Sequence, residues 1–328
     1  MNIQIQPAGQ AANSNYSRVS INRTSLEDFI LVGFTEDKEL QVVLFCIFFM
    51  FFLLNITGNI SILWFVTFDS SLHTPMYFFL GNLSFYDISF SSVVVPKMLY
   101  DFLSRQNTIT FGGCIAQMHF FHFLGSSEVT LLTIMSYDRL VAISNPLRYS
   151  VIMNRNLCLG LVVGSYIIGF LHSLLHTLFT AKLPFCGPNR VNHFFCDVKP
   201  VLILACSDIS VNLKLLTMVT GYLATTSFLL TLFPNILISK FLLKIQTVQG
   251  RKRAFSTCSA HLMVVSLLFG TAMFTYLGPS SQDILDQDRA AAVLFTVVTP
   301  ALNPVIYTLR NKDMKKAMKR VIQKWLKI

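Results

Sequence analysis

Charged residues are scarce in this chain of 328 residues, where Lys, Arg, Asp and Glu together account for only 13%. A water-soluble domain carries about 25%. Hydrophobic residues reach 53%, thirty of them phenylalanine, and the mean hydropathy is +0.57. One water-soluble core would not hide so many large apolar side chains, so the composition predicts an integral membrane protein.

The signatures of several other protein classes are missing. The sequence has no G-x-S-x-G, H-E-x-x-H or phosphate-loop motif, so we expect no enzymatic activity. The net charge is +10, but no basic face with interleaved aromatic residues accompanies it, which argues against nucleic-acid binding. Residues 1–40 contain no apolar signal-peptide core, so the first apolar run is expected to act as the membrane signal.

Seven apolar stretches are long enough to cross about 30 Å of hydrocarbon, and lipid allows such stretches only as helices. We therefore expect an all-α membrane protein, a seven-transmembrane helix bundle over 41–309. It is preceded by an extracellular N-terminal tail, 1–40, and followed by a cytoplasmic tail with an amphipathic helix, 310–328. The predicted spans are about 41–67, 75–102, 111–143, 157–180, 211–245, 254–278 and 290–309.

The distribution of basic residues predicts how the bundle is oriented. With the N-terminus outside, 16 of the 26 Lys and Arg residues fall on the cytoplasmic side, eight of them between Arg310 and Lys327. The positive-inside rule therefore favours an external N-terminus and a cytoplasmic C-terminus. Sequons at Asn15 and Asn22 agree with this orientation and are predicted glycosylation sites.

Beyond Arg310, apolar residues recur at helical spacing with Lys and Arg between them. This pattern predicts a basic amphipathic helix that lies on the inner leaflet; a solvated tail is the alternative. The apolar positions are Met314, Ala317, Met318, Val321, Ile322 and Trp325.

Four of the seven cysteines fall on the predicted outer side of the membrane. Cys114 begins the third span, and Cys186, Cys196 and Cys206 lie in the loop between the fourth and fifth spans. The outer face is oxidising, so an even set of four predicts two disulfides, for which the sequence alone allows three pairings.

Two carboxylates lie at membrane depth, where ionisable groups are costly and functional by default. Asp87 falls in the second span and Glu128 in the third, and with Asn59 and Asn303 they are predicted to form one polar cluster. If both carboxylates ionise, they require a cation such as sodium; otherwise one holds a proton. Neutral carboxyl groups that join helices by hydrogen bonds, or a transporter relay through Asp87 and Glu128, are the alternatives.

Other polar residues lie within the third and fourth predicted spans. Asp138 and Arg139 stand at the inner end of the third span, where they can pair, with topological anchoring as the alternative. Histidines at i, i+3 and i, i+4 spacing suggest either a metal site or hydrogen bonds in a pocket or between helices, and the lack of further ligands favours hydrogen bonds. They are His119, His122, His172 and His176.

Motifs along nearly the whole chain resemble those of one family. The two most specific are "LHTPMYFF" at 72–79 and "KRAFSTCSAHL" at 252–262. With them occur "MSYDRLVAISNPLRY" at 135–149 and "PALNPVIYTLRNKDMKKA" at 300–317. The chain thus resembles an odorant (olfactory) receptor of the class A, rhodopsin-like G-protein-coupled receptors. A class A receptor for a non-odorant ligand is the alternative.

The resemblance implies roles for individual residues. Asp138 and Arg139 match the D-R-Y motif and, with the N-P-x-x-Y residues, are implied to be the activation switch. Asp87 matches the sodium-site acid of class A receptors, and Glu128 matches a second acid typical of odorant receptors. The N-P-x-x-Y residues are Asn303, Pro304 and Tyr307, and the implied disulfides are Cys114–Cys196 and Cys186–Cys206.

The resemblance also implies a ligand and partners. A small, neutral, mainly apolar volatile is expected to bind within the bundle by burial and one or two hydrogen bonds from His122, Ser126 or Tyr276. At the plasma membrane the receptor would activate a heterotrimeric G protein of the stimulatory olfactory type. The implied ligand-binding residues are Phe121, His122, Gly125, Ser126, Val219, Leu223, Phe269, Ala272, Met273 and Tyr276.

The chain departs from the family pattern in the third and fifth predicted spans. Leu140 replaces the usual Tyr beside the charge pair, Ser144 replaces Cys, and Pro234 and Asn235 stand where the fifth helix usually carries Ser-Tyr. Since that Tyr is a switch residue in the family, its loss predicts weaker coupling or altered basal activity.

Overall fold

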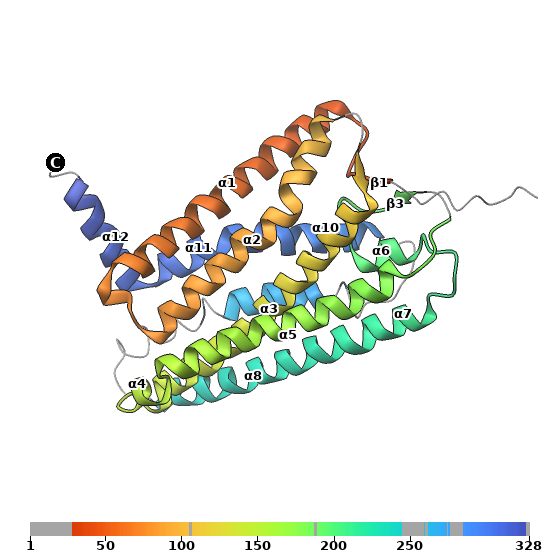
Figure 1. Ribbon diagram of the computed structural model, residues 1–328. Helices are drawn as coiled ribbons and strands as arrows, with labels where there is room; N and C mark the ends of the chain where they lie inside the picture. Colours follow the sequence, from red (N-terminus) through yellow and green to blue (C-terminus); the bar gives the residue numbers. More distant parts are fainter. Residues whose placement is uncertain are drawn as a thin grey trace, which may run out of the picture.

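A computed structural model of the chain describes residues 28–104, 107–186, 189–244, 259, 262–273, 275 and 285–325. The predicted glycosylation sites, Asn15 and Asn22, lie outside these residues. Within them the chain forms long helices that run side by side, with small strands at one end (Figure 1).

Seven helical segments lie within the residues that the structure describes, and each overlaps a predicted span; of the sixth span, predicted at 254–278, the structure describes the helix Leu262–Met273. Five are long and apolar enough by themselves to span a membrane; the more polar third span, α3, is 34 residues long, and Leu262–Met273 is a shorter apolar helix. The spans are α1 (Lys38–Phe68), α2 (Pro75–Leu103), α3 (Phe111–Ser144), α5 (Arg155–Ala181), α7–η2–α8 (Ser210–Leu215, Leu216–Thr220, Gly221–Lys244), Leu262–Met273 and α10–η4–α11 (Leu285–Val293, Leu294–Val298, Thr299–Arg310).

Shorter elements connect the spans. They are β1 (Asp28–Leu31), η1 (Ser70–Leu72), β2 (Thr108–Thr110), α4 (Tyr149–Ile152), β3 (Arg190–Val191), α6 (Val198–Leu202) and α12 (Lys312–Trp325).

Local chemistry explains several helix boundaries. Asp37 caps α1 by accepting from the Glu39 amide, and Asn154 caps α5 by accepting from the Leu157 amide, so each satisfies an amide that the first turn leaves open. Pro75 begins α2 at a position where no amide hydrogen is needed. Short π-helical turns, η2 and η4, interrupt the fifth and seventh spans and shift the register of the residues beyond them.

Helix α3 lies at the centre of the bundle, between α2 on one side and α5 and α8 on the other (Figure 1). Its approach to α5 is very close: a Cβ atom placed on Gly169 would lie 2.1 Å from Ser127 Oγ and 2.5 Å from the Phe123 carbonyl oxygen. Only glycine therefore fits at this crossing. Many side chains of α1, in contrast, such as Met50 and Trp64, are exposed, as a lipid-facing helix requires.

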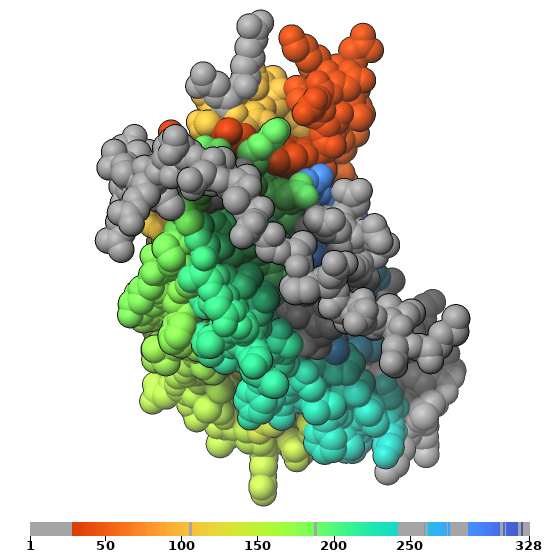
Figure 2. All heavy atoms as spheres, turned by 90° about the vertical axis from the view of Figure 1, so that its right-hand side faces the viewer, coloured from red at the N-terminus to blue at the C-terminus, as the bar shows by residue number. Residues whose placement is uncertain are grey.

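The end of the bundle that carries both disulfides, here called the disulfide end, is closed by a small sheet. Strand β1 pairs antiparallel with β2 and parallel with β3, in the order β2-β1-β3. Phe29 of β1 is fully buried against Phe111 and Phe185. Figure 2, which looks onto this end, shows the green loop residues after α5 between α1 and the α7 segment.

Both implied disulfides are present. Cys114–Cys196 joins the start of α3 to the loop after α5, and Cys186–Cys206 links two points within that loop. The loop is therefore tied to the bundle at α3 and cannot swing away from it.

The opposite end, here called the α12 end, is fastened by polar contacts. Helix α12 leaves α11 at an angle (Figure 1), and its Met314 and Ala317 are fully buried. Arg320 pairs with Asp69 at 2.8 Å and bonds Ser71 at 2.8 Å, both in the α1–α2 connection. The helix predicted from the alternating apolar and basic residues is thus present and anchored to its neighbours.

Candidate functional site

A cavity of about 50 Å³ lies among the central helices and is called the central cavity below. One water needs about 10–15 Å³ by the same kind of measure, so a small organic molecule is the natural size of occupant. Most of its wall is apolar, with polar tips from His122, Ser126, His172 and Thr220. The full lining is Phe121, His122, Gly125, Ser126, Val129, His172, Thr220, Leu223, Ala224, Ala272 and Phe295.

Of the ten residues implied as ligand-binding, six line the central cavity: Phe121, His122, Gly125, Ser126, Leu223 and Ala272. Phe269 is buried instead against Phe228, with ring centroids 5.8 Å apart. Val219 and Met273 are partly exposed and do not line the cavity, and Tyr276 lies outside the described residues.

Five lining residues were not expected from the sequence: Val129, His172, Thr220, Ala224 and Phe295. Val129 lies one turn beyond Gly125 and Ser126 on the same face of α3, so helical periodicity alone would have found it. Thr220 and Phe295 lie in the π-helical turns η2 and η4, where a regular helical pattern does not hold.

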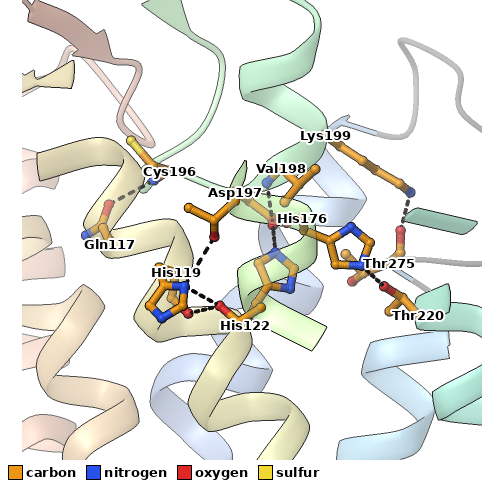
Figure 3. Close-up of polar contacts among 12 residues, drawn as sticks. Gln117, His119, His122, His176, Cys196, Asp197, Val198, Lys199, Thr220 and Thr275 are labelled. Atoms are coloured by element: carbon orange, nitrogen blue, oxygen red, sulfur yellow. Dashed lines mark hydrogen bonds and ion pairs between the residues drawn. The ribbon is translucent and has the colours of Figure 1, made fainter. Parts of the chain in front are cut away.

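The histidines of α3 and α5 make hydrogen bonds between helices. His172 bonds Ser126 through Nδ1 at 2.9 Å and Thr220 through Nε2 at 3.0 Å. His176 Nε2 lies 3.3 Å from the same Thr220 hydroxyl (Figure 3). His119 contacts the Ser173 hydroxyl at 2.8 Å. In the part of the chain that the structure describes, no group of three or more His, Cys, Asp or Glu side chains is placed to hold a metal.

The loop after α5 contacts α3, including one residue that lines the central cavity. His122 Nε2 donates to Asp197 Oδ1 at 2.9 Å, and the Cys196 amide donates to Gln117 Oε1 at 2.9 Å (Figure 3). Burial alone would raise the pKa of Asp197, but the hydrogen bonds from His122 and the Val198 amide hold that pKa below its usual value. The loop residue Asp197 is thus an ionised anchor for a cavity-lining histidine.

A second histidine, His193, belongs to the loop itself. It is 4% exposed and lies between the rings of Phe194 and Phe195, at centroid distances of 4.7 and 4.5 Å. Burial lowers the pKa of His193 to about 4; Asp197 opposes this shift and Arg289 adds to it. The folded loop therefore holds His193 in its neutral form at neutral pH.

This burial predicts a loss of stability in acid. An unfolded histidine takes a proton below a pKa of about 6.5, whereas the folded state resists it down to about 4. The stability that neutral His193 contributes is thus fully present above pH 6.5 and is lost as the pH drops towards 4. The free energy of unfolding falls by about 3 kcal/mol in all. Melting of the detergent-solubilised protein at pH 7 and pH 5 measures the effect.

A His193→Phe variant isolates the share of this one residue. Phenylalanine takes no proton and keeps the packing against Phe194 and Phe195, so we expect a clearly smaller drop in melting temperature from pH 7 to pH 5. The remaining buried histidines are the same in both proteins. An equal drop in the variant would contradict the assignment to His193.

The predicted polar cluster exists in the middle of the bundle. The fully buried Asp87 accepts two hydrogen bonds from Asn303 Nδ2, at 2.9 and 3.0 Å, and it interacts electrostatically with Glu128. Asn59 donates to Asn55 Oδ1 at 2.6 Å, and Asn55 Nδ2 donates to the Asp87 carbonyl oxygen at 3.2 Å, so the amides of α1 join the same network.

Within this cluster, acceptor oxygens outnumber donors. Glu128 Oε1, Asn59 Oδ1 and Asn303 Oδ1 are buried and accept no hydrogen bond from the described residues. Oxygen atoms of carboxylates and amides are the ligands that hard cations prefer, and a proton on one carboxylate would also relieve the excess. The residues present therefore fit the sodium ion or shared proton predicted from the sequence.

Of the residues implied as an activation switch, Asn303 belongs to this cluster, and Asp138, Arg139 and Tyr307 lie nearer the α12 end. Asp138 and Arg139 are buried, and Asp138 Oδ1 accepts from the Tyr149 hydroxyl of α4 at 2.8 Å. The buried Tyr307 lies close enough to Arg139 for the guanidinium charge to act on its phenol. Asn303 bonds Asp87, so α11 connects the polar cluster to the Arg139 region.

Comparison with known proteins agrees with this architecture. The family model described as "Olfactory receptor" matches residues 45–325. The chain is 50% identical over 307 residues to human "Olfactory receptor 12D1", covering 93% of this chain and 96% of that protein. It is 46% identical over 316 residues to mouse "Olfactory receptor 5G9", covering 95% and 98%. Human "Olfactory receptor 5A1" is 48% identical over 303 residues, covering 92% and 96%.

Proposed function

The chain belongs to the olfactory receptor family, whose members are G-protein-coupled receptors and not enzymes, and we propose that it binds a small, neutral, mainly apolar volatile in the central cavity. We propose further that binding activates a G protein of the stimulatory olfactory type. The observation that carries the first proposal is the cavity itself, which lies between the central helices and is lined almost entirely by apolar groups.

The chemistry of the cavity wall supports a neutral ligand. Among the described lining residues there is no Asp, Glu, Lys or Arg, so a charged ligand would lose its hydration without gaining a partner. Phe121 and Phe295, whose ring centroids lie 5.9 Å apart, supply the apolar contact area. Ser126, His172 and Thr220 place a few polar atoms on one side, enough to orient one functional group.

Signalling is proposed to be a shift between two arrangements of the bundle, driven by tighter binding of the ligand to one of them. Phe295 of the cavity belongs to η4, which continues directly into α11 with Asn303 and Tyr307. A ligand that presses on Phe295 thus acts on the helix that contacts both the polar cluster and the Arg139 region.

We propose that the disulfide end faces outward and the α12 end faces the cytoplasm. The excess of Lys and Arg in the tail after α11 supports this orientation, because basic residues are retained on the cytoplasmic side. The volatile would then enter from outside and the G protein would bind at the α12 end. Tags at the two termini, probed on intact and permeabilised cells, test the assignment.

An odorant panel in transfected cells tests the proposed function. At verified surface expression, we expect one or more neutral apolar volatiles to raise cAMP, and we expect the response to vanish in cells without the stimulatory G protein and to return when it is restored. A surface-expressed receptor with neither basal nor ligand-evoked cAMP would overturn the coupling proposal. Responses confined to charged odorants would overturn the ligand class.

Filling the cavity predicts a loss of response. Ala272 lines it, so an Ala272→Phe side chain would occupy the space that the volatile needs, and the potency of an agonist from the panel should fall more than tenfold. Ser266→Phe is the matched control, because Ser266 lies on the same helix and is exposed. Equal potency of the Ala272→Phe receptor at equal surface level would contradict this location of the ligand.

Sodium at the polar cluster is likewise a proposal, and salt dependence tests it. Replacing choline chloride by NaCl should raise the melting temperature of the purified receptor, and the increase should vanish in an Asp87→Asn or Glu128→Gln variant. Asp101→Asn is the control, since Asp101 lies on the same helix as Asp87 but pairs with Lys97. If both cluster variants keep the full increase, the cluster does not hold sodium.

A further inference from the structure

Four side chains form a continuous hydrogen-bonded chain along one wall of the central cavity. In order they are Ser126 of α3, His172 of α5, Thr220 of η2 and His176 of α5. Each is at most 9% exposed, and the first three line the cavity. This chain of four residues is called the polar relay below.

The polar relay can point in two directions with the same heavy-atom positions. A neutral imidazole donates from one ring nitrogen and accepts at the other, and a hydroxyl does both. In one direction Ser126 donates to His172 Nδ1, His172 Nε2 donates to Thr220, and Thr220 donates to His176 Nε2. In the other direction every bond reverses, so that His176 donates to Thr220, Thr220 to His172, and His172 to Ser126.

Both directions make the same three hydrogen bonds, carry the same number of protons and leave both imidazoles neutral. They differ in what Ser126 offers to the cavity. Among the described residues its hydroxyl bonds only His172, while its backbone carbonyl accepts separately from Thr130. When Ser126 donates to His172, its oxygen lone pairs are open to a ligand; when it accepts from His172, its O–H is open.

We infer that the polar relay lets Ser126 either donate a hydrogen bond to a ligand or accept one from it. The central cavity therefore binds a volatile with one hydrogen-bonding group, whether that group is an acceptor or a donor. The inference rests on the proposed function and names the ligand class more closely. A carbonyl compound, which only accepts, selects the relay direction with a free Ser126 O–H. An N–H compound such as a pyrrole, which only donates, selects the opposite direction.

The test uses three probes that each carry the same alkyl chain on a five-membered ring: a 2-alkylcyclopentanone, a 2-alkylpyrrole and an alkylcyclopentane. Their alkyl chain is chosen from the best agonist of the odorant panel, and the measurement is cAMP at matched surface expression. The ketone and the pyrrole are expected to activate with potencies within about tenfold of each other. Each should exceed the hydrocarbon by about tenfold, the effect of one net hydrogen bond.

Two variants separate the relay from a lone hydroxyl. Ser126→Ala should reduce both polar probes to the potency of the hydrocarbon. In His172→Leu, Ser126 loses its relay partner and is expected to donate to the carbonyl one turn before it, as helical serines do. Its O–H is then committed, so the ketone should lose about tenfold while the pyrrole keeps its potency.

His119→Leu is the matched control for folding. It removes another histidine hydrogen bond between α3 and α5, to Ser173, and His119 does not line the cavity. This variant should keep the wild-type ratio of ketone to pyrrole potency.

The outcomes are distinct. A wild-type receptor that responds to only one of the two polar probes, or a His172→Leu receptor that loses both equally while His119→Leu does not, overturns the relay but leaves the proposed function standing. A wild-type receptor that responds to no volatile at all overturns the proposed function, and the relay falls with it.

Discussion

A Gly169→Ala receptor is expected to lose most of its surface expression and to melt several degrees below the wild type. The added Cβ would lie 2.1 Å from Ser127 Oγ and 2.5 Å from the Phe123 carbonyl oxygen, far inside van der Waals contact. To accept it, α3 and α5 must separate along a crossing that both helices bury, and overpacking of this kind costs about 3 kcal/mol. Flow cytometry and thermal unfolding in detergent measure the loss.

Two further variants make the Gly169 prediction specific. Gly164→Ala lies on the same helix and its Cβ meets nothing within 4 Å, so it should express and melt like the wild type. Ser127→Gly added to Gly169→Ala removes the hydroxyl contact but leaves the Phe123 carbonyl, which is backbone and cannot rotate away. It should therefore restore only part of the loss. A fully stable Gly169→Ala receptor would contradict the close crossing.

The close crossing was invisible in the sequence for a physical reason. Hydropathy and length located the spans because lipid imposes about 20 apolar residues on each, and α2, predicted at 75–102, runs from Pro75 to Leu103. Which glycine meets which helix depends on rotation and tilt, which those two quantities do not contain. Gly160, Gly164 and Gly169 look alike in the sequence, yet only Gly169 meets a neighbour.

The lining of the central cavity could likewise be predicted from the sequence only in part. The family resemblance implied His122 and Ser126 together, and they lie one turn apart on the same face of α3. His172 was noticed only as half of an i, i+4 pair with His176, because nothing in the sequence says that α5 turns it towards Ser126. Phe295 reaches the cavity from a π-helical turn, and one extra residue in a turn moves every later side chain around the helix axis.

The structure of the disulfide end could be predicted only in part, because it is built from segments far apart in the chain. The even number of outer cysteines predicted two bridges but left three pairings, and only the family resemblance chose between them. The strand at Asp28–Leu31 was not expected, because its four residues pair with segments near 109 and 190 and no local pattern marks them. The buried His193 had no signal of its own, since its pKa is lowered by burial that exists only in the folded loop.

An Arg139→Ala receptor is expected to bind its volatile and fail to signal. Arg139 is buried near the α12 end, beside Asp138 and within electrostatic reach of Tyr307. Arg139 lies thirteen positions after Ser126 along α3, which at 1.5 Å per residue is about 20 Å, so the central cavity should be unaffected. We expect agonist-evoked cAMP to fall more than tenfold while the agonist still raises the melting temperature of the purified variant.

The control for this loss is Arg148→Ala, which removes an equal charge from an exposed position nine residues further on and should signal normally. Tyr149→Phe tests the neighbouring contact, because it deletes the hydroxyl that holds Asp138 and leaves Arg139 in place. If that hydrogen bond restrains the charge pair in the resting bundle, its loss should raise basal cAMP, opposite in sign to the effect of Arg139→Ala. Normal agonist-evoked cAMP from the Arg139→Ala receptor at matched surface level would rule out the switch role, because the buried guanidinium would then serve packing alone.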